Sequence, residues 1–481
     1  MESNPIYVNV LPETPRERVR FSRREWLALL GAAVCGAGYA FGHKSVFTTG
    51  NEHFPGIGLA LSVWLILGLC LAVTGTKHMR RSLFPLVSAL LLSATYGIFA
   101  DEALRLMNLP VVIGLTATAA YALADGRNIL SAAGLMESMR RLIADTLRHL
   151  PAPFLALFDL RHDGDDNGRA RALLLGLAIC VPVVGLAGLL LCSADTAFGD
   201  AIYRLLQHFE APNLSSSVWN LFRFGMLTLT IFSFIYGLTR WTAPEVKEHR
   251  IRLRPLTLSV VLAALCMLYF AFLYIHVSEL RAASASYAES AREGFFQLVQ
   301  VAFITMLVTL PALTIHPDSP AIRALGALAT LLTMGIVASA VWRMALYIRA
   351  YGWTLLRMVT LWGILAITAA MLAALVKCAR PGVRVCKALT VFAIITWILF
   401  NYANVDARIA QLNIAAHRSG ALEKLDPNYL AHLSPDALPA LRELAAAEPG
   451  YNKALTYAET LHRCDMPGWY DWSLSWLKAG D

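Results

Sequence analysis

Apolar stretches alternate with polar loops along almost the whole chain. They lie at 26–42, 56–74, 83–100, 111–124, 172–193, 222–239, 256–276, 295–314, 324–343, 358–376 and 387–403, and the fourth is short with poorly defined ends. A helix of about 20 apolar residues crosses a hydrocarbon core of about 30 Å. Because backbone groups in lipid must find partners within their own segment, each stretch is predicted to be a helix. We therefore expect an all-α, polytopic membrane protein with about eleven transmembrane helices.

The polar segments between these stretches divide the chain into five expected regions. They are a basic cytoplasmic tail (1–25), a first bundle of four spans (26–124), a cytoplasmic segment (125–171), a second bundle of about seven spans (172–403) and a helical extramembrane tail (404–481).

Composition agrees with a membrane location and argues against a nucleic-acid partner. Charged residues make up 15% of the chain and hydrophobic residues 57%, whereas soluble domains carry about 25% charged residues. The net charge of +8 comes from Lys and Arg placed between apolar stretches, which is the pattern of membrane topology. The expected partner is the lipid bilayer.

The distribution of Lys and Arg predicts the orientation. With a cytoplasmic N-terminus, the N-terminal tail and the loops on its side carry 25 of these residues, and the opposite loops carry eight. Such a bias places the basic side in the cytoplasm, and an odd number of spans places the C-terminus outside. Arg343, Arg349 and Arg357 fall on the outer side in this interpretation, and an even number of spans would place the C-terminus in the cytoplasm instead.

Two extramembrane segments have helical patterns of their own. Segment 129–150 has apolar residues at helical spacing and is either an amphipathic helix on the membrane surface or a packed surface helix. In the C-terminal tail, Asn404 is expected to cap a helix with Asp406 in its first turn, and Ser434 precedes a proline at a second helix start. The aromatic end, 469–476, is expected to pack in a small core or to line a membrane interface, and packing is favoured.

The candidate ligand-binding residues form two polar clusters at span ends on the same expected face. The first consists of His276, Tyr287, Arg292, Glu293 and Gln297, and the second of Arg343, Arg349 and Arg357. Arg beside Tyr or Trp suits both the recognition of an anion and anchoring at lipid headgroups. The clusters therefore predict either an anion site or interfacial linkers that tie helices together.

No catalytic residue, metal site or cofactor is predicted. The chain has no H-E-x-x-H, G-x-S-x-G or P-loop sequence. Its eight cysteines show no disulfide framework, and Cys378 and Cys386 are too far apart for the usual zinc spacing. We lean against an enzyme.

Several segments of the second half together resemble a known family. They are YAESAREGFFQLV (287–299), AYGWTLLR (350–357), the run at 404–414, LDPNYLAHLSPDALPAL (425–441) and WYDWSLSW (469–476). The chain resembles a bacterial multi-spanning membrane family known as domain of unknown function 4173, which is close to 4153, over roughly residues 255–481. It departs from the family in having Asn404-Val405-Asp406 in place of asparagine-proline-aspartate. The resemblance implies a bacterial inner membrane and no reaction.

Three functions remain open. The first is transport or ligand binding, which the number of spans and the prolines near or within them favour. The second is an envelope scaffold or sensory protein whose C-terminal helical tail binds a protein partner. The third is a membrane-embedded enzyme acting on lipid-linked substrates, with Glu279, Arg292 and Glu293 as its candidate groups.

Overall fold

The computed structural model describes most of the chain. The described residues are 21–43, 54–126, 131–154, 156, 184, 191, 198, 201, 212–240, 254–282, 295–464 and 468–477. Within these ranges, only the backbone is described for residues 132, 212–218, 276–282, 295–296 and 463–464. Every regular element in these ranges is a helix, and ten of the helices are long and apolar enough to cross a membrane. The remaining expected span, 172–193, which is the fifth along the chain, falls almost wholly outside the described residues. The polytopic all-helical fold is confirmed.

The long helices follow the expected stretches closely. They are α1 (Arg23–Gly42), α3 (Ile57–Thr74), α4 (Met79–Ile98), α5 (Glu102–Asp125), α10 (Pro212–Thr239), α11 (Pro255–Ala282), α13 (Phe295–Ile315), α14 (Pro320–Tyr351), α15 (Leu355–Ala379) and α16 (Val385–Tyr402). The patterned segment 129–150 contains α6 (Ala132–His149). Where the structure describes them in full, the connections between consecutive long helices are short.

The C-terminal tail consists of short helices. They are α17 (Val405–Arg418), α18 (Pro427–Ala431), η1 (Pro435–Ala437), α19 (Leu438–Ala447), η2 (Pro449–Tyr451), α20 (Asn452–Cys464) and η3 (Leu474–Trp476).

The chain forms two compact units. The first comprises Met1–Phe41, Leu65–Lys77 and Arg140–Trp241, and the second Gly42–Trp64, His78–Met139 and Thr242–Asp481. In the first unit α1 and α10 run antiparallel, since the Thr239 hydroxyl donates to Glu25 at 3.2 Å and Arg223 donates to the carbonyl of Ala40 at 3.0 Å.

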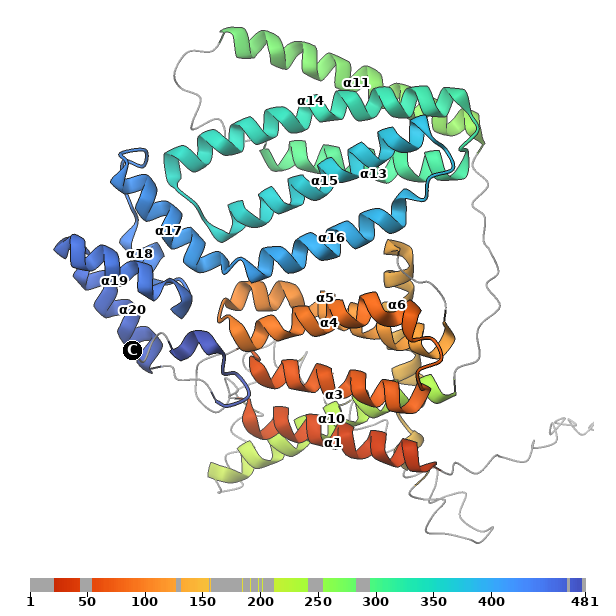
Figure 1. The fold of residues 1–481 in the computed structure, drawn as a ribbon, viewed down its shortest axis with the longest axis vertical. Helices are drawn as coiled ribbons and strands as arrows, with labels where there is room; N and C mark the ends of the chain where they lie inside the picture. The colour runs from red at the N-terminus through yellow and green to blue at the C-terminus, as the bar shows by residue number, and fades with distance from the viewer. Residues whose placement is uncertain are drawn as a thin grey trace, which may run out of the picture. The chain divides into compact units, whose positions relative to one another are not determined.

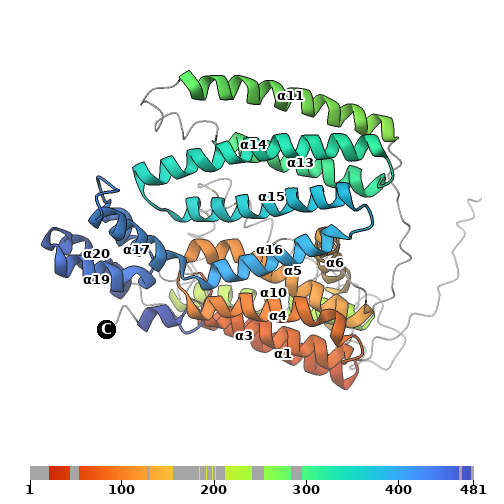
Figure 2. The same ribbon diagram turned by 45° about the horizontal axis from the view of Figure 1, so that its top comes forward.

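The second unit contains an apolar core of buried residues from α11, α13, α14 and α15. Its helices α11, α13, α14, α15 and α16 lie side by side, as Figures 1 and 2 show, and α16 also contacts α4, which packs on α5. Buried hydroxyls link the first three of these helices, since Tyr269 and Thr305 lie 2.8 Å apart and Thr333 donates to Thr305 at 3.4 Å. Hydrogen bonds of this kind between membrane helices contribute about 0.6–2 kcal/mol each.

Helix α5 is longer than the pattern predicted. It begins at Glu102 instead of 111, because the polar residues in its first turns are buried and hydrogen-bonded. Arg105 donates to the carbonyls of Tyr96 and Phe99 at 2.8 and 3.1 Å. Asn108 donates to the Asn401 side chain at 2.6 Å. A hydropathy pattern scores these residues as loop, whereas the structure satisfies them inside the bundle.

The tail packs against one end of the second unit. Helix α17 contacts α15 and α16, and η3 contacts α4. Figure 2 shows α17, α19 and α20 gathered beyond the ends of α14, α15 and α16. Because consecutive helices alternate in direction, this end also holds the start of α3, the connection from α4 to α5 and the turn from α14 to α15.

Candidate functional site

The structure describes only part of the first predicted cluster. Tyr287, Arg292 and Glu293 lie outside the described residues, and for His276 only the backbone, within α11, is described. Gln297 is exposed on the first turn of α13. Whether these residues form one site stays a prediction.

The second predicted cluster occupies the last turns of α14 and the first turn of α15. Arg343 is half-buried, Arg349 is exposed and Arg357 is buried. The three guanidinium groups therefore have different surroundings and different roles.

Arg357 holds the turn between the two helices. Its Nη1 atom donates to the carbonyl of Tyr351 at 3.0 Å and to that of Gly352, and its guanidinium lies 4.1 Å from the centre of the Tyr347 ring. The last carbonyls of a helix have no partner within it, so Arg357 caps α14 from the neighbouring helix. Its donors are thereby directed at protein carbonyls.

The C-terminal tail holds the same turn from the other side. The Asn413 side chain accepts from the N–H of Trp353 at 2.6 Å and donates to the carbonyl of Trp353 at 2.9 Å. Gly352 has φ 76°, and a Cβ there would press against Asn413, so glycine suits both the left-handed backbone and the close approach. The N–H of Leu355 donates to the Tyr429 hydroxyl at 3.3 Å.

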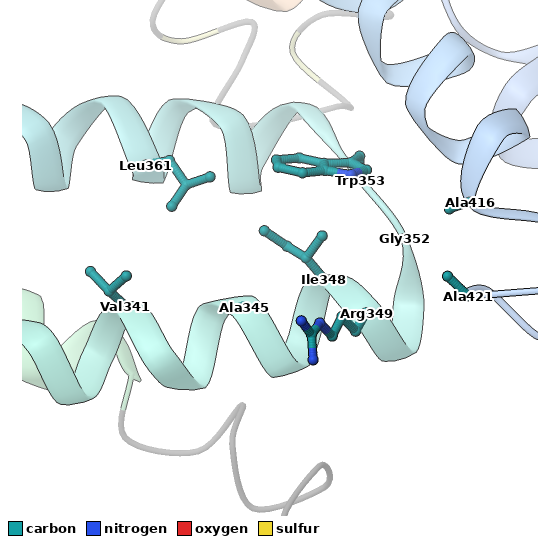
Figure 3. A pocket seen from close by; sticks show the side chains of 9 residues that line it. All are labelled: Val341, Ala345, Ile348, Arg349, Gly352, Trp353, Leu361, Ala416 and Ala421. Atoms are coloured by element: carbon teal, nitrogen blue, oxygen red, sulfur yellow. The ribbon is translucent and has the colours of Figure 1, made fainter. Parts of the chain in front are cut away.

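A cavity of about 340 Å³ lies beside this turn. It is lined by Val341, Ala345, Ile348, Arg349, Gly352, Trp353, Leu361, Ala416 and Ala421. Figure 3 shows Ile348 of α14 and Leu361 of α15 pointing towards each other, with Trp353 at the turn and the two tail alanines at the far side of Gly352. Arg349 is the one charged residue in this lining and the other lining residues are mostly aliphatic, so the cavity suits an apolar group that carries a negative charge at one end.

Three aspartates lie where the tail meets the connection from α4 to α5. Asp436 accepts from the N–H of Ala100 at 3.3 Å and from the Ser475 hydroxyl at 2.5 Å. The Ser475 hydroxyl oxygen also lies 2.8 Å from the carbonyl oxygen of Ile98. One buried carboxylate thus joins two parts of the tail to the end of α4.

The start of α17 contributes the second aspartate. Asp406 accepts from the N–H of Ser434 at 3.0 Å, and the Asn404 side chain donates to Asp436 at 3.2 Å. Asn404 occupies the predicted cap position of α17, with φ 51°, but its side chain makes no cap hydrogen bond there. Its amide is instead used in the contact with η1, and Asp406 lies in the first turn of α17 as predicted.

The third aspartate belongs to the membrane bundle. Asp101 caps α5 by accepting from the N–H of Leu104 at 3.0 Å, and its second oxygen, Oδ2, is buried without a hydrogen-bond partner among the described residues. Burial, together with the charge of Asp406, raises the pKa of Asp101 to about 7. Burial also raises the pKa of Asp406, and the charge of Asp436 acts in the same direction.

Several of these contacts are made by Asn404, Asn413 and Ser475, which lie in the segments on which the sequence resemblance rests. A family model described as domain of unknown function (DUF4153) matches residues 86–444, well over half of the chain. The chain belongs to the DUF4153 family. The resemblance is thus confirmed for the related family 4153 and extends from α4 onward, whereas the match to family 4173 stays a prediction. No curated protein and no solved structure matches the chain.

The DUF4153 match ends within α19, and the aromatic end of the chain lies beyond it. There the carbonyl of Tyr470 accepts from the N–H groups of Gly56 and Gly58 at 3.0 and 2.9 Å, and that of Trp472 accepts from Ile57 at 2.8 Å. The Asp471 carboxylate lies 2.6 Å from Nδ1 of His43. Tyr470 is buried and Trp469 is exposed, so this segment packs on the bundle with one aromatic ring left outside.

Sequence reasoning missed Asp101, Asp436 and Asp471 as members of one polar region. Each was visible as an acidic residue at a segment end, but their partners are distant along the chain. A usable signal was the concentration of Asp and Asn in the family segments, which marks groups that need partners once buried.

Proposed function

We propose that this DUF4153 protein binds an anionic membrane lipid in the cavity between the α14–α15 turn and the C-terminal tail. The observation that supports this most is the lining of the cavity, in which Arg349 is the one charged residue among mostly aliphatic residues. Such a site suits an acyl chain next to a phosphate. This is the ligand-binding form of the first function that the sequence left open.

The location of the cavity favours a lipid over a soluble ligand. It lies at the ends of two membrane-spanning helices, which is the depth of lipid headgroups. The apolar residues Val341 and Leu356 near it are exposed and would lie against acyl chains. Arg357 and the amide of Trp353 are already engaged with the protein, so Arg349 is the group left to meet a phosphate.

In this proposal the cavity and the tail face the outside of a bacterial inner membrane, and the N-terminus faces the cytoplasm. The excess of Lys and Arg on the N-terminal side supports this orientation. Alkaline phosphatase and a fluorescent protein, each fused after Asp481, test it. Phosphatase activity without fluorescence is expected, and fluorescence without phosphatase activity would contradict it.

The binding experiment compares two arginine variants in purified protein. Native mass spectrometry in detergent, with phosphatidylglycerol or phosphatidylcholine added, measures the retained lipid. Wild type is expected to retain phosphatidylglycerol preferentially, and Arg349→Ala to lose at least about tenfold in affinity, since a charge-assisted hydrogen bond contributes about 1.5–3 kcal/mol. Arg408→Ala removes an exposed tail arginine outside the cavity and is expected to bind as wild type.

A second variant fills the cavity without changing the charge of the protein, so it tests whether the lipid occupies the cavity itself. Ala421→Trp places a ring in the cavity from its exposed tail side and is expected to reduce retention of both lipids. Unchanged phosphatidylglycerol retention in both Arg349→Ala and Ala421→Trp would exclude the cavity as the lipid site. Binding of a protein partner by the tail stays a prediction.

A further inference from the structure

Two buried carboxylates, Asp101 and Asp406, lie at the junction of the membrane bundle and the tail, and neither belongs to the lipid cavity. Asp436 links their surroundings, because it accepts from the N–H of Ala100, next to Asp101, and from the side chain of Asn404, two residues before Asp406. Asp101 is 7% exposed and Asp406 is 6% exposed. Asp101 comes from the connection between α4 and α5, and Asp406 from the first turn of α17. The region therefore joins two segments whose aspartates lie 305 positions apart in the sequence.

The hydrogen bonds around these carboxylates leave one oxygen unused. Oδ1 of Asp101 accepts from Leu104, and Asp406 accepts from the N–H of Ser434. Oδ2 of Asp101 is buried and has no partner among the described residues. An unpartnered buried carboxylate oxygen is costly, and a proton on it removes the charge and supplies a donor.

The neighbouring Arg105 lowers the pKa of Asp101 but only partly offsets the effect of burial. Arg105, on α5, directs its guanidinium at the backbone carbonyls of Tyr96, Phe99, Phe54 and Asp471. The other titratable groups that interact with this region come from α4, α5, α15, α18, η1 and the aromatic end, and they are Tyr96, Glu102, Arg357, Tyr429, Asp436 and Asp471. Asp436 adds a third negative charge next to Asp406.

We propose that Asp101 and Asp406 bind one proton between them, and that this proton holds the C-terminal tail against the membrane bundle. Two carboxylates that share a dry site do not both ionise readily, as in the paired aspartates of acid proteases. With the proton present, the pair carries one charge and one additional donor. When the proton is lost, the buried junction holds two like charges, which repel each other and push α17 away from the start of α5.

The pKa values of the two aspartates in the docked and the undocked state determine how docking of the tail changes with pH. Burial raises the pKa of Asp101 to about 7 in the docked state, and burial raises that of Asp406 as well. In the undocked state both return towards about 3.9, the ordinary value for Asp. The docked state therefore holds more protons, so docking is strongest below the ordinary pKa and weakens as the pH rises towards 7.

Hydrogen exchange of the full-length protein in lipid nanodiscs tests the proposal. The amides of Gly56, Ile57 and Gly58 donate to the aromatic end of the tail and report docking. After correction for intrinsic exchange, their protection in wild type is expected to fall at least tenfold between pH 6 and pH 8. Above pH 8 it is expected to level off, because both carboxylates are then ionised in either state.

Asparagine variants show whether the pH dependence comes from the proton on the aspartate pair and not from a general effect of pH on folding. Asp101→Asn keeps the helix cap, since Asn caps as well as Asp, and imitates the protonated acid. Asp101→Asn and Asp406→Asn are each expected to keep the tail protected at pH 8, whereas Glu423→Gln, which changes an exposed tail carboxylate, is expected to keep the wild-type pH dependence. Protection in wild type that does not change with pH, or a wild-type pH dependence in both Asn variants, would overturn the proposal.

Discussion

The hydroxyl oxygen of Tyr470 lies 3.1 Å from the hydroxyl oxygen of Ser62, although 408 positions separate the two residues. Tyr470 is buried at this contact, which lies on the first turns of α3. The aromatic end of the chain is thus inserted against the membrane bundle instead of extending from it.

Tyr470 is expected to contribute both packing and a hydrogen bond. Tyr470→Phe should cost about 0.5–1.5 kcal/mol through the lost hydroxyl. Tyr470→Ala should cost about 3–5 kcal/mol through the cavity it leaves. Thermal unfolding in detergent measures both. Leu474→Ala, in which the residue replaced is 48% exposed, should change stability by less than about 0.5 kcal/mol, and a loss as large as that of Tyr470→Ala would contradict the assignment.

Two glycines of α3 provide a matched pair. A Cβ on Gly58 would overlap the Tyr470 ring, whereas a Cβ on Gly68 meets nothing within 4 Å. Gly58→Ala should therefore lower the midpoint of thermal unfolding. Gly68→Ala should leave it unchanged or raise it slightly, since Ala is favoured over Gly by about 0.5–1 kcal/mol in a helix. Equal effects of the two substitutions would show that the tail does not approach Gly58.

Arg357 is expected to act on the fold and Arg349 on ligand binding. Arg357→Ala leaves the carbonyls of Tyr351 and Gly352 without their donor and should destabilise the protein by about 1.5–3 kcal/mol. Arg357→Lys should recover only part of this, because an ammonium lacks the planar fork. Arg349→Ala should unfold at the wild-type temperature in lipid-free detergent. If Arg349→Ala destabilised the protein and Arg357→Ala did not, the structural role would belong to Arg349 and not to Arg357.

The spans were predictable from the sequence because twenty apolar residues in lipid leave the backbone no other choice than a helix. The start of α5 was not, since the partners that make Arg105 and Asn108 tolerable inside the bundle lie elsewhere in the chain. Asn404 illustrates the same limit: its position predicted a helix cap, but its amide bonds Asp436, which lies 32 positions away. Local patterns indicate which polar residues need a partner, and only the fold shows which partner is used.

The candidate site was predictable to a similar degree. The cluster of Arg343, Arg349 and Arg357 was recognisable as a group of cations at the end of a span. The sequence did not distinguish the arginine that caps α14 from the one that lines the cavity, because both lie near Tyr and Trp. That distinction depends on the sharp turn at Gly352 and on Asn413 of the tail, which brings Ala416 and Ala421 to the same cavity.

The central claim is that the C-terminal tail forms part of the membrane bundle. The N–H groups of the first turn of a helix have no partner within that helix, so slow exchange at Ile57 and Gly58 requires the carbonyls of Tyr470 and Trp472. The most direct measurement is hydrogen exchange at Gly56, Ile57 and Gly58 at pH 6 in wild type and in Tyr470→Ala. These amides should be strongly protected in wild type and lose that protection in the variant. Exchange in wild type at the rate of an open chain would contradict the docked tail.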